Sequence, residues 1–181
     1  VGEHQMDVAH FIKFSNPRRF ITSGGLGTMG FGMPAAIGAK LGMPENEVFN
    51  VDGDGSFAMT VQELATAKVN GVKVINVIMN NGYLGMVRAW NDMFYEGRRS
   101  QVWLGKVPNF EKLAQAYELE GISVDKPSEI SEALQRGMKN DETTVIDVQV
   151  KAEAIVLPIV PAGARNSEMI GAKIPKGYFD Q

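Results

Sequence analysis

The stretch VDGDGSFAMT, residues 51–60, decides how this chain folds. It continues an apolar run that includes Val48 and Phe49 and is typical of a buried strand, and a helix-like pattern begins directly after it. Two aspartates alternate with two glycines where the strand ends, and glycine permits both unusual backbone angles and the close approach of a ligand. A strand that leads through such a loop into a helix indicates an α/β unit with a binding loop at the strand's end.

The composition limits the class of protein. The chain has 181 residues, 44% of them hydrophobic and 22% charged, which is ordinary for a globular domain with its own core. It contains no cysteine, which excludes disulfides, thiolate metal sites and a cysteine nucleophile and fits a reducing compartment such as the cytoplasm. No Lys/Arg cluster stands out beyond two arginine pairs, and no apolar run approaches the roughly 20 residues of a membrane span. We therefore expect neither a nucleic-acid nor a membrane partner.

Short apolar runs alternate with segments of helical period along the chain. The expected strands are Arg19–Thr22, Val48–Val51, Val72–Met79, Ile122–Val124 and Thr144–Val150. The expected helices are Met33–Leu41, Thr60–Val69, a helix over about Gly85–Trp90 and beyond, Phe110–Glu118 and Glu129–Met138. This alternation predicts an α/β fold, a parallel sheet with helices on both faces, in a single domain over residues 1–181 whose tail from about Pro158 is irregular.

Local signals support the starts of two helices. Pro34 falls in the first turn of the helix that begins near Met33, where its missing N–H leaves no helical hydrogen bond unmade. Thr60 and Glu63 are spaced as a capping box, so we expect the next helix to begin at Thr60.

Three polar loops follow expected strands. They are SGGLGTMG (23–30), DGDGS (52–56) and NNGYLGM (80–86). The carboxyl ends of parallel strands meet at one edge of the sheet, which is where open α/β sheets bind ligands. We therefore expect the three loops to converge on one site.

The loop at 52–56 also has two simpler interpretations. Asp-Gly is a common turn pair, so the loop alone is compatible with an ordinary turn. Counted from Asp52, positions 1, 3, 5 and 12 would suit a calcium loop, but Phe57 stands at position 6, where that loop needs glycine, and a strand precedes it in place of a helix. The calcium interpretation is therefore rejected.

A dinucleotide site is a stronger alternative. Residues 25–30 match G-x-G-x-x-G between an expected strand and an expected helix, and Asp52 lies 22 residues after Gly30. This interpretation leaves Asn80 and Asn81 unexplained, and it needs only one acidic residue. It keeps an NAD(P)-binding dehydrogenase domain as the alternative from a different class.

A magnesium diphosphate explains all three loops. Asp54 offers a carboxylate oxygen and Asn81 an amide oxygen, and Mg²⁺ usually takes one or two carboxylates together with ligand phosphates. The glycines and Ser56 place backbone N–H groups near the start of the next helix, where an anion is favoured. The 24 residues between Gly55 and Asn80 suffice for one helix and one strand, which return the chain to the same sheet edge.

The motif G-D-G, followed about two dozen residues later by N-N, resembles the diphosphate signature of thiamine diphosphate enzymes. Longer stretches resemble the large catalytic subunit of acetolactate (acetohydroxyacid) synthase: HQM (4–6), PRRFITSGGLGTMGFGMPAAIGA (17–39), GDGSFAMTVQELATAKVNGV (53–72), NNGYLGMVRAW (80–90) and VLPIVPAGA (156–164). The resemblance covers nearly the whole chain but only the C-terminal third of that subunit, which has a thiamine-diphosphate-binding fold.

The resemblance implies roles for individual residues. Asp54, the Asn81 side chain and the backbone carbonyl of Tyr83 are expected to bind Mg²⁺. Contacts to thiamine diphosphate are expected from Gly27, Met29, Gly53, Asp54, Gly55, Ser56, Asn81, Leu84, Gly85 and Met86.

Three of these residues have more specific implied roles. The Gly27 carbonyl would accept a hydrogen bond from the cofactor's amino group, and Met29 would act as the apolar wedge that holds the two cofactor rings in a V. Met86 and Trp90 would line the substrate pocket, with Trp90 closing the acceptor side. Core packing is the alternative for Met29, and packing on a helix face is the alternative for Trp90.

Glu3 departs from the family pattern, which usually has Gln at this position. A carboxylate beside a diphosphate is electrostatically unfavourable, so either Glu3 points away or the diphosphate contact is weaker in this chain. The neighbouring His4 is expected to lie near the diphosphate in a polar, supporting role.

The chain also lacks parts of the family's subunit. The glutamate that activates the cofactor sits in an N-terminal domain and FAD binds a central domain, so neither is expected in these 181 residues. A start at Val1 without an initiator Met fits a piece of a longer protein.

The resemblance implies a reaction and partners as well. Pyruvate would be decarboxylated and joined to a second 2-oxo acid, in branched-chain amino-acid biosynthesis. The implied partners are further copies in a homo-oligomer, other domains of a thiamine diphosphate enzyme, and a regulatory subunit. Another thiamine-diphosphate-dependent 2-oxo-acid decarboxylase or carboligase is the alternative within the same class.

Overall fold

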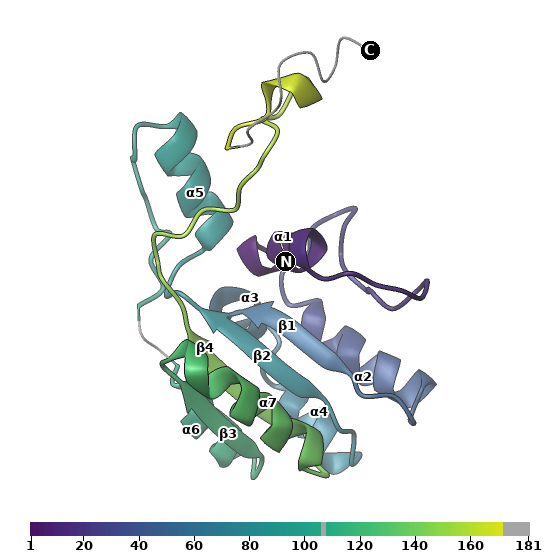
Figure 1. The fold of residues 1–181 in the computed structure, drawn as a ribbon. Coiled ribbons are helices and arrows are strands. Elements are labelled where there is room, and N and C mark those ends of the chain that lie inside the picture. Colours follow the sequence, from purple (N-terminus) through teal and green to yellow (C-terminus); the bar gives the residue numbers. More distant parts are fainter. Residues whose placement is uncertain (106–107, 172–181) are drawn as a thin grey trace.

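A computed structural model describes residues 1–105 and 108–171 of the protein. Four strands form one sheet: β1 (Phe49–Gly53), β2 (Ile75–Asn80), β3 (Glu120–Val124) and β4 (Thr144–Gln149). All pairs are parallel and the spatial order is β1-β2-β4-β3. This confirms the predicted parallel α/β sheet (Figure 1).

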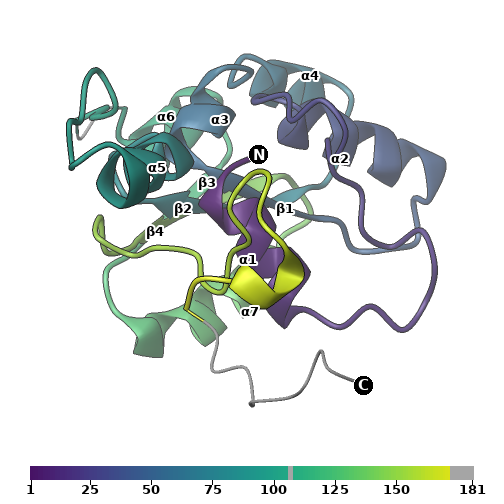
Figure 2. The same cartoon turned by 90° about the horizontal axis from the view of Figure 1, so that it is seen from above.

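Helices cover both faces of the sheet, as Figure 2 shows. The described helices are α1 (Glu3–Phe11), α2 (Gly32–Gly42), α3 (Asp54–Ala58), α4 (Glu63–Val69), α5 (Gly85–Phe94), α6 (Phe110–Ala116) and α7 (Ile130–Lys139), with 3₁₀ turns η1 (Pro127–Glu129) and η2 (Asn166–Glu168). Helices α1 and α7 lie on one face, and α2, α4 and α6 lie on the other. None of the helices in the described ranges is long and apolar enough to cross a membrane.

Alternating strand residues build a separate core on each face. On the face covered by α2, α3, α4 and α6, the fully buried rings of Phe57 and Phe110 meet edge to face at 5.7 Å above Val145. On the face covered by α7, Ala133 packs with Ile146 and neighbouring apolar side chains. Burial on both sides gives a rigid platform, so loops at its edge are held in fixed relative positions.

Helix α5 and the chain after β4 extend from the carboxyl edge of the sheet (Figure 1). In the part of the tail that the structure describes, residues 158–171, one antiparallel bridge joins Ile159 to Ile170 beside η2. The remainder of the predicted irregular tail, 172–181, lies outside the described residues.

Three sequence-based expectations differ from the structure. The strand expected at Arg19–Thr22 is wrong: this segment is irregular, and Phe20 and Ile21 are 37% and 57% exposed because no strand pairs with them. The capping box is also wrong: the Glu63 N–H donates to the backbone carbonyl of Thr60 at 3.0 Å rather than to its hydroxyl, and helix α4 begins only at Glu63. The Thr60 hydroxyl donates to the carbonyl of Gly30 at 2.9 Å. Helix α1 was not expected, and it packs against β1.

Candidate functional site

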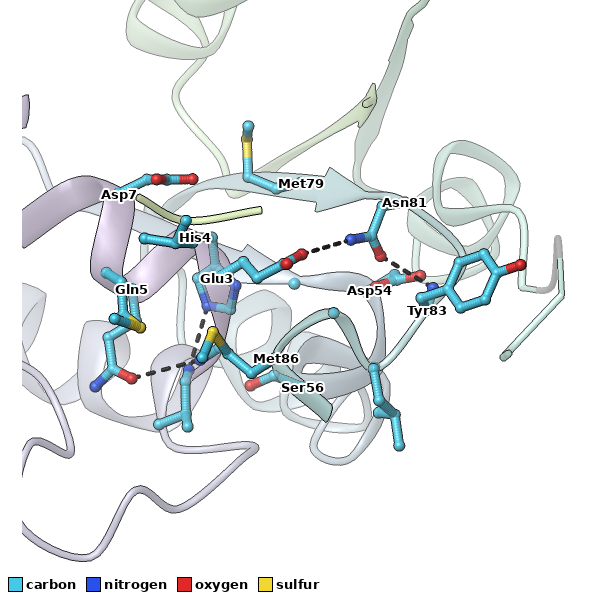
Figure 3. Close-up of a pocket in the computed structure, with 18 of the residues that line it drawn as sticks. Glu3, His4, Gln5, Asp7, Asp54, Ser56, Met79, Asn81, Tyr83 and Met86 are labelled. Atoms are coloured by element: carbon cyan, nitrogen blue, oxygen red, sulfur yellow. Dashed lines mark hydrogen bonds between the residues drawn. The ribbon is translucent and has the colours of Figure 1, made fainter. Parts of the chain in front are cut away.

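A cavity of about 470 Å³ opens at the carboxyl edge of the sheet, above the ends of β1 and β2. The three polar loops all contribute to its wall, with Gly27 and Met29 from the first, residues 53–56 from the second, and Asn81 and residues 83–86 from the third. The start of α1 and the segment after β4 complete the lining (Figure 3). Segments far apart in the sequence therefore meet at one place, as parallel strand topology requires.

Asp54 and Asn81 hold oxygen atoms at the ends of two neighbouring strands. Asp54 is the first residue of α3, directly after β1, and its carboxylate accepts the N–H of Gly82 at 2.8 Å. The Asn81 side-chain oxygen accepts the N–H of Tyr83 at 2.9 Å. Burial raises the pKa of Asp54, and hydrogen bonds from backbone N–H groups lower it in part. A cation bound beside the carboxylate would favour its charged form.

The donor set suits Mg²⁺ better than a softer or protein-caged metal. Among the described residues no group of three or more His, Cys, Asp or Glu side chains could hold a metal ion. Mg²⁺ is usually held by one or two carboxylates, with its remaining positions filled by water and ligand phosphates. In Figure 3 the ring of Tyr83 extends away from Asp54 and Asn81, which leaves only its backbone to act at the site.

Gly55 and Met29 form a closely packed part of the wall. A Cβ at Gly55 would lie 2.9 Å from the Leu104 side chain and 3.0 Å from that of Leu84, so a larger residue there would require these leucine side chains to move. The end of the Met29 side chain is the next nearest group, at 3.5 Å. The hydroxyl of Ser56 accepts the N–H of Gly30 at 3.0 Å and so ties the first loop to the second.

A buried His–Asp contact joins His4, in the cavity wall, to Asp52 behind it, and this contact was not expected from the sequence. The ring of His4 packs over Gly53, where a Cβ would lie 3.0 Å away, and its Nε2 is 3.5 Å from a carboxylate oxygen of Asp52. Burial lowers the pKa of His4 to about 3 and raises the pKa of Asp52. The short distance to Asp52 favours a charged histidine, but the loss of solvation of the buried ring has the larger effect on its pKa. His4 is therefore neutral at pH 7.

Glu3 does not point away from the site. Its carboxylate accepts the Asn81 side-chain N–H at 3.1 Å, as Figure 3 shows. It also lies 3.3 Å from the guanidinium of Arg88. Arg88 is 1% exposed and also meets Asp92, one helical turn further along α5. The i, i+4 spacing of Arg88 and Asp92 on a helix was sufficient to predict their ion pair from the sequence. The contact between Arg88 and Glu3 depends on α1, which the sequence pattern did not predict.

All of the expected cofactor and metal residues lie in this lining, and one expected substrate residue does not. Gly27, Met29, Gly53, Asp54, Gly55, Ser56, Asn81, Tyr83, Leu84, Gly85 and Met86 all line the cavity. Trp90 lies further along α5, is 39% exposed, and packs edge to face on Phe94 at 5.7 Å. Its role at an acceptor pocket stays a prediction.

An open parallel sheet with glycine-rich loops and hard oxygen donors at its carboxyl edge defines a domain that binds a phosphorylated cofactor. Residues 1–148 match the family model described as "Thiamine pyrophosphate enzyme, C-terminal TPP binding domain". The chain belongs to this family of thiamine pyrophosphate (thiamine diphosphate) binding domains.

Relatives of known function are similar over almost the whole chain. The acetolactate synthase large subunit of Lactococcus lactis is 47% identical over 171 residues, which cover 94% of this chain and 30% of that protein. The isozyme 3 large subunit of Escherichia coli is 46% identical over 173 residues, 93% of this chain and 30% of that protein. This chain therefore spans about 30% of the length of the curated relatives it matches.

A solved structure shows the same fold. The thiamine diphosphate-dependent 4-hydroxybenzoylformate decarboxylase of Rhodococcus jostii superposes with a TM-score of 0.64 at 29% identity, covering 68% of this chain and 23% of that one.

Proposed function

We propose that this chain is the thiamine diphosphate and Mg²⁺ binding domain of an acetolactate-synthase-like enzyme. Such an enzyme decarboxylates pyruvate and joins the product to a second 2-oxo acid, a reaction that supplies branched-chain amino acids. The observation that carries the proposal is the meeting of three polar loops at one cavity that contains Asp54 and Asn81. Sequence identity of 46–47% to acetolactate synthase large subunits supports this enzyme over other members of the class.

The residues of this chain would hold the cofactor by its diphosphate end. Asp54, the Asn81 side chain and the Tyr83 carbonyl would bind Mg²⁺, whose remaining positions diphosphate oxygens would fill. Backbone N–H groups of Gly55 and Ser56 would bind the same diphosphate. When bound, the cofactor serves as the electron sink for decarboxylation.

The apolar part of the cavity would orient the reacting end. Met29, Leu84 and Met86 line the wall and would keep water away from the cofactor rings. The Gly27 carbonyl would accept a hydrogen bond from the cofactor's amino group, and Met29 would press the rings together. Closely packed apolar contacts are suited to both tasks because they add no competing hydrogen-bond partner.

The whole protein would contain parts that these residues do not supply. We place the activating glutamate and FAD in other domains of such an enzyme, with the active protein a cytoplasmic homo-oligomer. The relatives' description as large subunits supports a regulatory partner. We therefore expect the chain alone to bind the cofactor weakly and to make no acetolactate until the other domains are added in trans. Robust turnover by the chain alone would contradict this assignment of the activating glutamate to another domain.

Calorimetric titration of thiamine diphosphate, with and without Mg²⁺, tests the binding proposal. We expect binding that requires Mg²⁺, and no binding of NADH. Binding of NADH without binding of thiamine diphosphate would overturn the proposal. The dinucleotide alternative also required a strand directly before the G-x-G-x-x-G loop at 25–30, and the described residues 1–24 contain none.

A second candidate is another thiamine-diphosphate-dependent 2-oxo-acid decarboxylase or carboligase. The structural similarity to the 4-hydroxybenzoylformate decarboxylase favours it over functions outside the class. Product analysis of the complete enzyme with pyruvate separates the two: acetolactate supports the first candidate, and acetaldehyde as the sole product supports the second.

A further inference from the structure

Glu3 projects a carboxylate into the proposed cofactor cavity, at a place prepared for an anion. One of its oxygens accepts the Asn81 side-chain N–H at 3.1 Å, and the other lies 3.3 Å from the Arg88 guanidinium. The group lies against the backbone of Gly85, so closely that a Cβ on Gly85 would collide with it. Gly85 is the first residue of the ten-residue helix α5.

These neighbours are the ones that would also bind a phosphate oxygen. The first turn of an α-helix presents N–H groups without intrahelical partners and a partial positive charge. The Asn81 amide adds a side-chain donor, and Arg88 adds a full positive charge from a position that is 1% exposed. In the described structure the Glu3 carboxylate accepts the bonds from Asn81 and Arg88 and lies against Gly85 at the start of the helix.

The surrounding charges show why Glu3 in particular is held here. Asp92, the other carboxylate near Arg88, is bound by Arg99 through two contacts of 2.7 and 2.8 Å. Asp92 is thus held mainly by Arg99, and the Arg88 guanidinium is shared between Glu3, at 3.3 Å, and Asp92, at 3.4 Å. Asp7 lines the same cavity, but its described interactions include no bond to Asn81 or Arg88.

We propose that Glu3 determines cofactor affinity by competing with the diphosphate: its carboxylate occupies part of the anion site that Asn81, Arg88 and the start of α5 form. A diphosphate must displace this carboxylate or bind beside a like charge, and either event weakens binding. This inference rests on the proposed function, since it needs a diphosphate in the cavity. It makes Glu3 a residue that sets the affinity of the site and the preference for phosphorylated ligands.

A positioning role for Glu3 predicts the opposite sign. If its function were to hold Asn81 in place for Mg²⁺, loss of the carboxylate would weaken binding. Glu3→Gln keeps the size of the side chain and an oxygen that can accept the Asn81 N–H, so it removes the charge with little change in shape. The direction of the affinity change therefore separates the two roles.

The experiment titrates wild type, Glu3→Gln and Glu3→Ala with thiamine diphosphate, thiamine monophosphate and thiamine in the presence of Mg²⁺. We expect both variants to bind thiamine diphosphate roughly tenfold more tightly than wild type. The gain is expected to be smaller with the monophosphate and absent with thiamine. Asp7→Asn is the matched control: it removes a carboxylate from the same cavity, and through-space charge alone is expected to change affinity by less than about twofold.

Each outcome decides between the proposals. Tighter diphosphate binding by both variants, confined to phosphorylated ligands, supports the competition, including the case in which only the variants bind measurably. Equal or weaker binding by the variants overturns it and leaves the proposed function standing. An equal gain for thiamine, or for Asp7→Asn, also overturns it. If no protein binds thiamine diphosphate, the proposed function fails and this inference fails with it. Thermal unfolding of each variant without ligand confirms that the proteins compared are folded.

Discussion

Replacing Asp54 by Asn should stabilise the ligand-free fold and abolish its response to Mg²⁺. The substitution keeps the shape of the side chain and an oxygen that can accept the Gly82 N–H, which the carboxylate accepts at 2.8 Å. It removes a negative charge that is 6% exposed and close enough to the Asp147 carboxylate to be destabilised by it. A residue that serves the fold would lose stability on substitution, whereas a metal ligand loses function.

The sign of the change follows from the raised pKa of Asp54, whose largest cause is burial. The charged carboxylate is disfavoured in the folded protein, so we expect a higher free energy of unfolding for Asp54→Asn than for wild type at pH 7. In a chain of this size, each kcal/mol of added stability raises the melting temperature by about 2–4 °C. The folded-state pKa of Asp54 lies above its ordinary value of 3.8. The charged carboxylate therefore lowers the stability of wild type fully above the folded-state pKa, and this destabilisation disappears as the pH falls towards 3.8. The advantage of Asp54→Asn should therefore shrink with falling pH.

Two measurements check the prediction. Thermal unfolding in EDTA at pH 7 and at lower pH gives the stability difference, and calorimetry gives thiamine diphosphate affinity with and without Mg²⁺. We expect Mg²⁺-dependent binding to fall by at least about 100-fold, because even groups that only support metal ligands are typically worth 10–100-fold.

Asp147→Asn is the matched control for this experiment. Asp147 is also buried with a raised pKa, and its carboxylate accepts side-chain N–H groups of Asn80 and Gln149 at 2.9 and 3.1 Å, but it lies outside the cavity lining. We expect a similar gain in stability with affinity within a few-fold of wild type. The reasoning would be refuted if Asp54→Asn bound thiamine diphosphate with the same Mg²⁺-dependent affinity as wild type. It would also be refuted if the ligand-free variant were clearly less stable than wild type.

Three further predictions concern other parts of the molecule. Burial lowers the pKa of His4 to about 3, whereas its ordinary value is 6.5, so the folded protein should lose about 1.4 kcal/mol of stability per pH unit as the pH falls below 6.5. Urea unfolding of His4→Gln should lack this pH-dependent loss, and identical pH slopes for the variant and wild type would contradict the prediction. Phe57→Ala should cost about 3–5 kcal/mol in the same assay, since the ring is fully buried against Phe110; a cost below 1 kcal/mol would count against this packing. In a complete enzyme, Trp90→Leu should change the preference between pyruvate and 2-oxobutyrate as acceptors roughly tenfold. A competition assay between the two acceptors measures this, and an unchanged product ratio would assign Trp90 to packing with Phe94 alone.

Periodicity along the chain was sufficient to predict four strands, five helices and their arrangement as a parallel sheet covered on both faces. These elements have long apolar patterns, as in VKVINVIM (72–79), and burial of an apolar face dominates their stability. The site loops were predictable for a related reason. Parallel topology takes the ends of β1 and β2 to one edge, so Asp54 and Asn81 meet whatever the details of packing.

Contacts between distant segments decided the rest. The sequence of Arg19–Thr22 suits a strand, but a strand needs a partner, and Phe20 and Ile21 remain exposed without one. Thr60 has the spacing of a cap, yet the Glu63 N–H donates to its backbone carbonyl, and its hydroxyl donates to the carbonyl of Gly30, thirty residues earlier in the chain. Local pattern cannot anticipate a hydrogen-bond partner that only the folded chain brings near.

The charges at the site show the same division most clearly. Sequence alone determined that a carboxylate at position 3 would be unfavourable beside a diphosphate. Only the tertiary structure decided that α1 would bring Glu3 to Asn81 and to the buried Arg88, 78 and 85 residues away along the chain. Electrostatic interactions depend on distance and burial rather than on sequence separation, so the effect of a charged residue becomes readable only when its neighbours are known.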